Sequence, residues 1–194
     1  MTTIRESLDR HRDDPVPQLQ FSVPVDRLMD DPYLNTLTAD LHRAAPSGFE
    51  RLAATKKCGA MIPDKPGVYF FVWSPSVALK SATHKKDLSI RFVLYVGKAG
   101  GAGSSGTLRS RFNNEYRKFV GGPTDNLWAD VGSGRREDRL RKWLALQPLD
   151  YWYTVVEDNS MVESLESRLI DLLNPPLNAQ TGPRLRRGAT REAF

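Results

Sequence analysis

The chain is poor in the residues and runs that build disulfide frameworks and membrane spans. Its 194 residues include a single cysteine, Cys58, which cannot form an internal disulfide and has no cysteine or histidine partner at metal-ligand spacing. We expect it to be a small buried hydrophobic residue. No apolar run approaches the roughly 18 residues that a membrane helix needs, and the first thirty residues lack the apolar centre of a signal peptide. These absences favour a cytoplasmic protein with no membrane partner.

Acidic residues are comparatively scarce after the first fifty positions. The net charge is +5, yet residues 1–50 hold 5 Lys and Arg against 9 Asp and Glu, which gives −4. The other 144 residues therefore hold 23 basic and 14 acidic side chains, which gives +9. Clustered Lys and Arg gain affinity for phosphates by releasing condensed counterions, so this asymmetry indicates a polyanionic partner. A solvated basic surface explains the same counts equally well.

Prolines at positions 15, 17, 24, 32 and 46 break any long helix near the start of the chain. We interpret residues 1–60 as an N-terminal accessory arm packed on the core, with short helices around 26–29 and 33–44. The arm could equally contact DNA or a second subunit. Residues 61–180 form the predicted core, and the polar, basic residues 181–194 form a C-terminal tail.

The core alternates β-forming runs with helical periodicity. Residues 67–73 and 90–96 predict a pair of antiparallel strands, joined by a polar loop or extended hairpin, and residues 149–156 predict a third strand. Helices are expected over 108–120, with Thr107 as N-cap, over 135–146 and over 161–173. The predicted fold class is α/β in the broad sense (α+β), with a small antiparallel sheet flanked by helices.

Short motifs follow one another within this core in a definite order. They are Gly67-Val68-Tyr69, Tyr95-Val96-Gly97-Lys98, the stretch from Leu108 to Arg111, Glu166 with Leu169-Ile170, and the stretch from Pro175 to Asn178. Each alone is a weak signal, whereas the ordered set, over about residues 64–180, resembles the GIY-YIG nuclease family. The resemblance implies that family's fold and the hydrolysis of DNA phosphodiester bonds.

The resemblance also implies which residues transfer protons and stabilise charge. It places the base or water-orienting phenol at Tyr69, with Tyr95 beside it. A phenol has an unperturbed pKa of about 10 and needs nearby cations to ionise at neutral pH, which is the role expected for Lys98. Arg111 is expected to donate two hydrogen bonds to the scissile phosphate. In the alternative interpretation, both tyrosines are ordinary core residues of the strands whose hydroxyls find hydrogen-bond partners.

One carboxylate in the pattern, Glu166, is available for a divalent cation. A lone carboxylate suits Mg²⁺ or Mn²⁺, which keeps most of its waters and completes its shell with phosphate oxygens. We therefore expect one metal ion per active site. Glu163, one turn earlier, is the competing assignment, with ion pairing as its other role. Asn178 resembles the family's polar residue that orients active-site groups or backbone.

The chain departs from the family pattern in its spacings. The 26 positions that separate the two motif tyrosines exceed the family's usual gap, and glycine-rich residues lengthen the distance from Lys98 to Arg111. Insertions of this kind add surface for DNA contacts. Many relatives carry histidine or tyrosine four residues after the arginine, where this chain has Glu115. Tyr116 fills that role only with a helical shift.

Other residues are candidates for tracking a nucleic-acid backbone. Arg109 is about 200° around the predicted helix from Arg111, so the two cannot face the same pocket. The candidates for nucleic-acid contact are Arg109, Tyr116, Arg135, Arg136 and Arg139. A merely solvated surface is an equally good interpretation of the arginines.

The sequence thus predicts a metal-dependent DNA endonuclease, and the compact chain with its insertions favours restriction-type double-strand cleavage. Cutting both strands with one active site per chain favours a homodimer. The alternatives are a structure-selective repair nuclease, a DNA-degrading toxin and, from a different class, a catalytically silent nucleic-acid-binding module. RNA also stays open as a substrate, because nothing in the sequence reads a 2′-hydroxyl.

Overall fold

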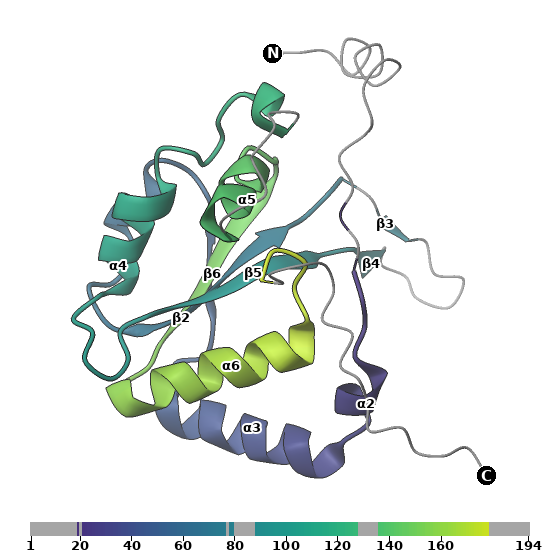
Figure 1. Ribbon diagram of the computed structural model, residues 1–194, viewed down its shortest axis with the longest axis vertical. Helices are drawn as coiled ribbons and strands as arrows, with labels where there is room; N and C mark the ends of the chain where they lie inside the picture. Colours follow the sequence, from purple (N-terminus) through teal and green to yellow (C-terminus); the bar gives the residue numbers. More distant parts are fainter. Residues whose placement is uncertain (1–18, 20, 77, 80–87, 128–135, 179–194) are drawn as a thin grey trace.

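The computed structural model describes residues 19, 21–76, 78–79, 88–127 and 136–178. They form a mixed α/β arrangement, with a four-stranded antiparallel sheet and helices on its two faces (Figure 1). The strands are β1 (Glu50–Ala53), β2 (Gly67–Trp73), β5 (Phe92–Ala99) and β6 (Leu149–Val155), with a separate hairpin of β3 (Ala78–Leu79) and β4 (Leu88–Ser89). The helices and turns are α2 (Val25–Leu28), α3 (Asp31–Ala44), η1 (Cys58–Ala60), α4 (Leu108–Arg111), η2 (Phe112–Tyr116), η3 (Thr124–Leu127), α5 (Arg136–Trp143), η4 (Asn159–Met161) and α6 (Val162–Leu173). None of the helices described is long and apolar enough to cross a membrane.

The strands lie in the order β1-β6-β2-β5, so β2 is an inner strand and β5 is an edge strand of this sheet. β2 pairs with β5 and with β6 in antiparallel register along its whole length. The predicted strands over 67–73 and 149–156 are confirmed, and so is the antiparallel pairing of the first two. The second strand begins at Phe92 and continues to Ala99, beyond the predicted end at 96.

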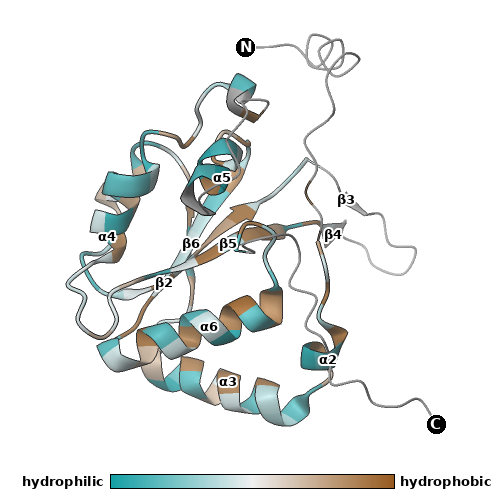
Figure 2. Ribbon diagram, viewed as in Figure 1, coloured by the Kyte–Doolittle hydropathy of each residue, from teal (hydrophilic) through white to brown (hydrophobic). Residues whose placement is uncertain are grey.

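Both faces of the sheet are covered, which explains why β2 has no polar alternation. Val68, Phe70 and Val72 point to the layer of α3 and α6, whereas Tyr69 and Phe71 point to the layer of α4, η2 and α5. Hydrophobic residues accordingly run along the strands, and the helices carry mixed faces (Figure 2). Cys58 is fully buried, as expected, in the core between the sheet and the layer of α4, η2 and α5.

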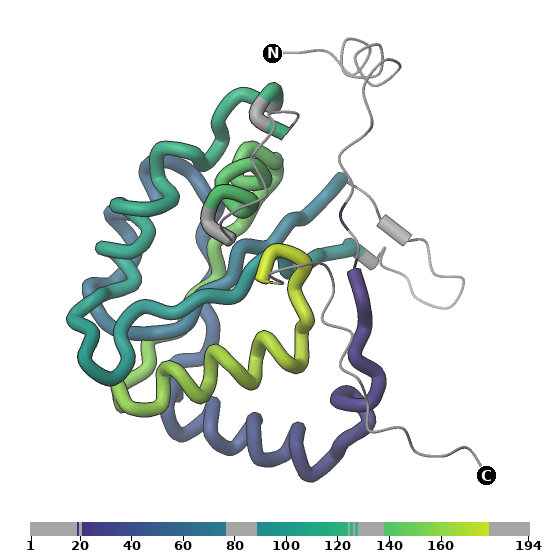
Figure 3. The backbone as a smooth tube through the Cα atoms, viewed as in Figure 1, coloured from purple at the N-terminus to yellow at the C-terminus, as the bar shows by residue number. Residues whose placement is uncertain are grey.

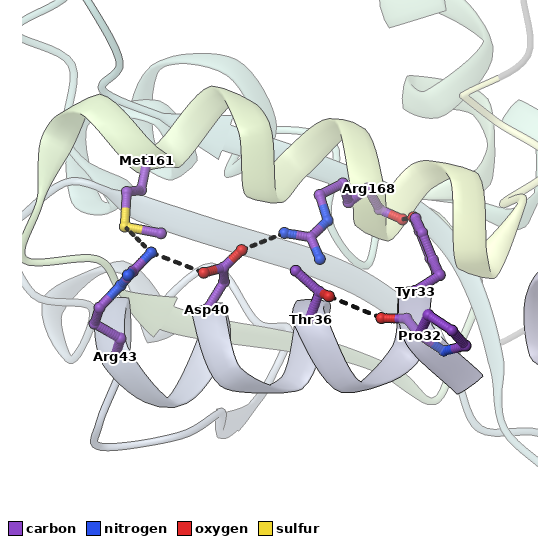
Figure 4. Close-up of polar contacts among 7 residues, drawn as sticks. All are labelled: Pro32, Tyr33, Thr36, Asp40, Arg43, Met161 and Arg168. Carbon is purple, nitrogen blue, oxygen red and sulfur yellow. Dashed lines mark hydrogen bonds and ion pairs between the residues drawn. The ribbon is translucent and has the colours of Figure 1, made fainter. Parts of the chain in front are cut away.

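Part of the expected N-terminal arm belongs to the sheet and its helical cover. β1 extends the sheet by pairing with β6, and α3 lies beside α6 (Figure 1). Two polar contacts tie α3 to α6: the Arg168 guanidinium lies 2.5 Å from the Asp40 carboxylate, and the Tyr33 hydroxyl donates to the Arg168 carbonyl at 2.9 Å (Figure 4). The helix that carries Glu166 is therefore held from two sides, by the sheet and by α3.

After α6 the chain turns back to the edge of the sheet (Figure 3). Asn174 ends the helix in the left-handed region at φ 41°, a conformation that asparagine tolerates better than most residues. The backbone N–H of Leu177 then donates to the Leu94 carbonyl at 3.1 Å. This return brings Asn178 beside β5, the strand that carries the second motif.

Candidate active site

A pair of buried tyrosines forms the centre of the site. Tyr69 on β2 places its hydroxyl oxygen 2.7 Å from that of Tyr116, which belongs to η2. Their side chains are 1% and 4% exposed, respectively, so water barely reaches this hydrogen bond. Tyr95 on β5 lies alongside, with its ring centroid 6.2 Å from that of Tyr69.

The second tyrosine of the pair reaches Tyr69 because the helix after Arg111 widens. η2 is a π-helical turn in which the Arg117 N–H donates to the Phe112 carbonyl, five residues back, at 2.9 Å. A π turn accommodates one extra residue compared with an α turn. It directs Tyr116 at Tyr69 and leaves Glu115 to pair with Arg111. The helical shift that the sequence required for Tyr116 is thus present, while the catalytic role remains a prediction.

The phenols of the pair are neutral at ordinary pH. Burial, followed by the neighbouring phenols of Tyr116 and Tyr95, raises the pKa of Tyr69 well above its usual value. Burial likewise raises the pKa of Tyr116. The described contacts of Lys98 lie elsewhere, so the expected stabilisation of a phenolate by this lysine is not seen in this arrangement. Among the described residues, Arg111 is the cation that interacts electrostatically with Tyr69 and Tyr116.

Gly97 allows the tyrosine to lie over the edge strand. It pairs with Tyr69 across the two strands, and a Cβ atom at this position would lie 2.5 Å from the Tyr69 hydroxyl oxygen and 2.7 Å from a ring carbon of Tyr95. Both distances are far below van der Waals contact. The glycine of the second motif is therefore explained by close packing of the phenol on the backbone.

Lys98 marks a second cluster, on the opposite face of the sheet. Successive side chains of a strand alternate between faces, and Lys98 pairs with Val68, which packs in the α3 and α6 layer. Its ammonium nitrogen lies 2.8 Å from a carboxylate oxygen of Glu163 and 3.8 Å from one of Glu166. The Glu163 side chain is 68% exposed, whereas that of Glu166 is 14% exposed. The hydrogen bond from Lys98 lowers the pKa of Glu163.

Glu163 and Glu166 offer oxygen ligands of the kind that a divalent cation binds. No group of three or more His, Cys, Asp or Glu side chains capable of holding a metal occurs in the described part of the chain. Glu166 and Glu163 instead offer a pair of hard oxygen donors on one helix face. Such a set fits Mg²⁺ or Mn²⁺, which retain waters and need few protein ligands. The Glu166 carboxylate is the better shielded of the two, and the Glu163 carboxylate lies closer to Lys98.

Arg111 is the last residue of α4, and its side chain is partly exposed to solvent. It forms an ion pair with Glu115, and the two side chains are 40% and 31% exposed, respectively. Burial alone would lower the pKa of Arg111, but the hydrogen bond with Glu115 and the nearby Tyr69 raise it on balance. The guanidinium is therefore a permanent cation that stands beside the tyrosine pair with one face open to solvent.

Asn178 holds the backbone of the second motif. Its side-chain oxygen accepts from the Val96 N–H at 2.8 Å, and its side-chain nitrogen donates to the Val96 carbonyl at 2.7 Å. The amide thus occupies the place that a further strand would take at this edge. Val96 lies between Tyr95 and Gly97, so Asn178 fixes the stretch on which both clusters depend.

A second asparagine, Asn159, was not singled out by the sequence. Its side-chain oxygen accepts from the Gly101 N–H at 2.8 Å, and its nitrogen donates to the Gly101 carbonyl at 3.0 Å. Gly101 has φ +109°, which favours glycine. Asn159 thereby ties the loop after Lys98 to the beginning of α6. The one signal in the sequence is an asparagine just before a helix, which usually indicates only a cap.

The residues expected to contact nucleic acid lie in different surroundings. Arg109 is half-buried and donates through Nε to the Ile62 carbonyl at 2.7 Å. Tyr116 is buried in the pair described above. Arg139 is half-buried on α5. Arg135 lies outside the described residues, as does the side chain of Arg136.

Comparison with protein-family models, with curated proteins and with solved structures finds no match. A functional assignment therefore depends on the residues of this chain and on their geometry. Two clusters flank a single peptide bond, between Gly97, on which Tyr69 packs, and Lys98, which faces the glutamates. A phenol pair and an arginine thus lie on one face of the sheet beside this strand, and a lysine and a shielded carboxylate lie on the other face.

Proposed function

We propose that this protein is a metal-dependent endonuclease of the GIY-YIG type, which hydrolyses phosphodiester bonds in DNA. The observation that carries the proposal is the junction of the two clusters at the Gly97–Lys98 peptide bond. Tyr69, Lys98 and Glu166 lie at this junction, and Asn178 holds the backbone beside it. If the tyrosines were only core residues of the strands, nothing would require an arginine on one face of the sheet and a carboxylate on the other.

Glu166 is the proposed ligand of one Mg²⁺ or Mn²⁺ ion, at a point where Lys98 already approaches the carboxylate. Such an ion, when bound, stabilises charge on phosphoryl oxygens and acidifies bound water. Lys98 holds the two glutamates in place and limits their mutual repulsion. Glu163, more exposed and closer to Lys98, has the role of pairing with this lysine.

Arg111 supplies the second positive group of the proposed site. Its guanidinium can form charge-assisted hydrogen bonds with a phosphate and so stabilise the charge that develops during hydrolysis. Glu115 holds the side chain in place before substrate arrives. A phosphate that replaces Glu115 as partner keeps the arginine paired throughout.

Tyr69 has a role that depends on its protonation. A neutral phenol can donate or accept a hydrogen bond, but it cannot serve as a phenolate base. In the arrangement described, the Tyr69 hydroxyl is neutral, buried and bonded to Tyr116. The pair therefore orients groups at the site, and proton abstraction by Tyr69 requires that bound DNA or metal alter its surroundings.

The proposed reaction is restriction-type cleavage of double-stranded DNA by a homodimer, since one active site per chain cuts one strand. Incubation of the protein with supercoiled plasmid and Mg²⁺ tests this, with EDTA as the control and sequencing of the ends. We expect discrete metal-dependent fragments with a repeated end sequence. Cuts confined to branched substrates indicate a repair nuclease, and a smear indicates a degrading nuclease.

A second candidate is a catalytically silent nucleic-acid-binding module. It is favoured by the closed state of the clusters, in which Lys98 and Arg111 are both paired with glutamates and Tyr69 is buried. In this case the chain binds DNA in a salt-sensitive manner, and no metal produces cleavage of DNA or RNA. Assays on plasmid, branched duplex and RNA with Mg²⁺ and Mn²⁺ separate the two candidates.

A further inference from the structure

A basic hollow lies next to the candidate site, on another face of α4, the helix that carries Arg111. Its volume is about 500 Å³, and its walls come from α4, η2 and the residues around η1. Lys56, Lys57, Arg109 and Arg117 line it, together with Asn113. None of its lining residues is acidic. Four cations thus surround a single depression, and their mutual repulsion favours the binding of an anion.

The cations of the hollow form none of the ion pairs found within the described part of the chain. Arg117, Lys56 and Lys57 are exposed and take part in none of the salt bridges found among those residues. Arg109 is held by the hydrogen bond from Nε to the Ile62 carbonyl, which fixes the direction of its guanidinium. One arginine held by a hydrogen bond and three exposed cations make a suitable site for a phosphate group.

The floor of the hollow is built by close packing. Gly59 lies against the helix, and a Cβ atom there would lie 3.1 Å from the side-chain amide carbon of Asn113 and 3.2 Å from a ring carbon of Phe112. The glycine therefore allows the lysine-bearing turn to approach η2. This contact brings Lys56 and Lys57, distant in sequence, to the helix that carries Arg109 and Arg117.

We propose that this hollow binds a backbone phosphate of double-stranded DNA other than the phosphate that is cleaved. The proposal rests on the proposed function, because it places the second phosphate relative to Arg111. Arg111 pairs with Glu115 and does not line the hollow. The hollow and Arg111 thus present cations on different faces of the same short helix, α4.

The test is the salt dependence of binding to a duplex of arbitrary sequence, measured in EDTA so that no cleavage intervenes. Arg117→Gln and Lys57→Gln each remove one cation of the hollow. Lys118→Gln is the matched control, because Lys118 is the next residue, is exposed, and lies 4.9 Å from the Phe119 ring centroid, outside the hollow. We expect each hollow variant to lower the slope of log K against log salt by up to about 0.9, the contribution of one neutralised phosphate, with the control unchanged.

The proposal is overturned if the hollow variants keep the wild-type slope, or if Lys118→Gln lowers it equally. Failure of the hollow and failure of the nuclease proposal give different results. Cleavage by wild type together with unchanged slopes removes the hollow alone. Reduced slopes without cleavage by wild type on any substrate remove the nuclease activity and leave the phosphate site. Binding confined to RNA overturns the assignment to duplex DNA.

Discussion

The side-chain amide of Asn178 makes both of its hydrogen bonds to one residue, Val96, at 2.8 and 2.7 Å. Val96 is the middle of the run that carries Tyr95, Gly97 and Lys98. A side chain that follows α6 thus completes the edge of the strand on which both clusters of the candidate site lie. The relationship explains why a polar residue is buried here, at 6% exposure.

Removal of this amide should loosen the edge strand. Asn178→Ala leaves the N–H and carbonyl of Val96 without their partners, and each buried polar group left unsatisfied costs about 1–3 kcal/mol. We expect a loss of unfolding free energy in that range or above, measured by urea denaturation. Stability within about 0.5 kcal/mol of wild type, the usual range for surface changes, would contradict the role assigned to Asn178.

Gly97 should not tolerate a side chain. In Gly97→Ala the new methyl group meets the Tyr69 hydroxyl at 2.5 Å, and overpacking of this kind costs about 1–3 kcal/mol. The matched control is Gly106→Ala, whose Cβ has its nearest neighbour at 3.4 Å, the Ser104 hydroxyl oxygen. Thermal unfolding of both variants checks the expectation. Equal melting temperatures for the two would refute the packing of Tyr69 on Gly97.

The buried phenols predict a fall in stability at high pH. The pKa of Tyr69 and Tyr116 is raised from 10.0, and burial with the Glu50 carboxylate raises that of Tyr153 to about 12. Above pH 10 the unfolded chain ionises these groups while the folded chain keeps them neutral, so protons stabilise the fold. Stability is retained below pH 10 and declines as the pH rises through the folded values.

Alkaline titration followed by phenolate absorbance, with circular dichroism on the same samples, measures this. We expect the Tyr69 phenolate to appear only with unfolding, so that Tyr69→Phe removes no absorbance change from the folded protein near pH 10. Tyr153→Phe should remove part of the decline in stability between pH 10 and about 12. A Tyr69 phenol that titrates near pH 10 in the folded protein is incompatible with the buried pair.

Asp40 forms ion pairs with two arginines, and the two pairs should contribute differently to stability. Arg168 lies 2.5 Å from its carboxylate with side chains 19% and 21% exposed, whereas Arg43 lies 2.7 Å away and is 70% exposed. A shielded charged hydrogen bond contributes about 1.5–3 kcal/mol, and an exposed pair about 0–1 kcal/mol. Arg168→Gln should therefore lower the urea midpoint clearly, and Arg43→Gln hardly. The reverse order would show that α3 and α6 are not held together through Arg168.

The elements that sequence reasoning placed well are those with long, uniform patterns. β2 was predicted over the residues it occupies because seven consecutive apolar or β-forming residues suit a strand covered on both faces. α6 was recognised by the helical spacing of Val162, Leu165 and Leu169, all of which are buried. Thr107 was recognised as an N-cap, and it accepts from the Ser110 N–H in a capping box. Such local signals need no knowledge of partners.

The elements that sequence reasoning missed depend on partners. β1 is a four-residue strand with mostly exposed side chains, and its pairing with β6 alone makes it a strand. Strand alternation places Lys98 on the face opposite Tyr95, and its contacts with Glu163 and Glu166 depend on the packing of α6 against that face. The π turn at η2 has no sequence signature in this chain.

The site was therefore predicted as a set of residues and not as an arrangement. The tyrosines, Arg111, Lys98 and Glu166 were named from the ordered motifs, but their contacts within the two clusters follow from the structure. The same holds for the closed state of the tyrosine pair, since burial of Tyr69 is a property of the packed core. The roles assigned to these residues stay predictions until cleavage is measured.

We propose that Glu166, and not Glu163, holds the metal ion of a nuclease. Cleavage of plasmid DNA by wild type, Glu166→Gln and Glu163→Gln in excess Mg²⁺ tests it most directly, with DNA binding in EDTA as the control for folding. We predict that Glu166→Gln loses at least about 100-fold in rate, because a metal contributes several kcal/mol to charge stabilisation. Glu163→Gln should cut near the wild-type rate, and both variants should bind DNA as wild type does. Cutting by Glu166→Gln at the wild-type rate would contradict the account.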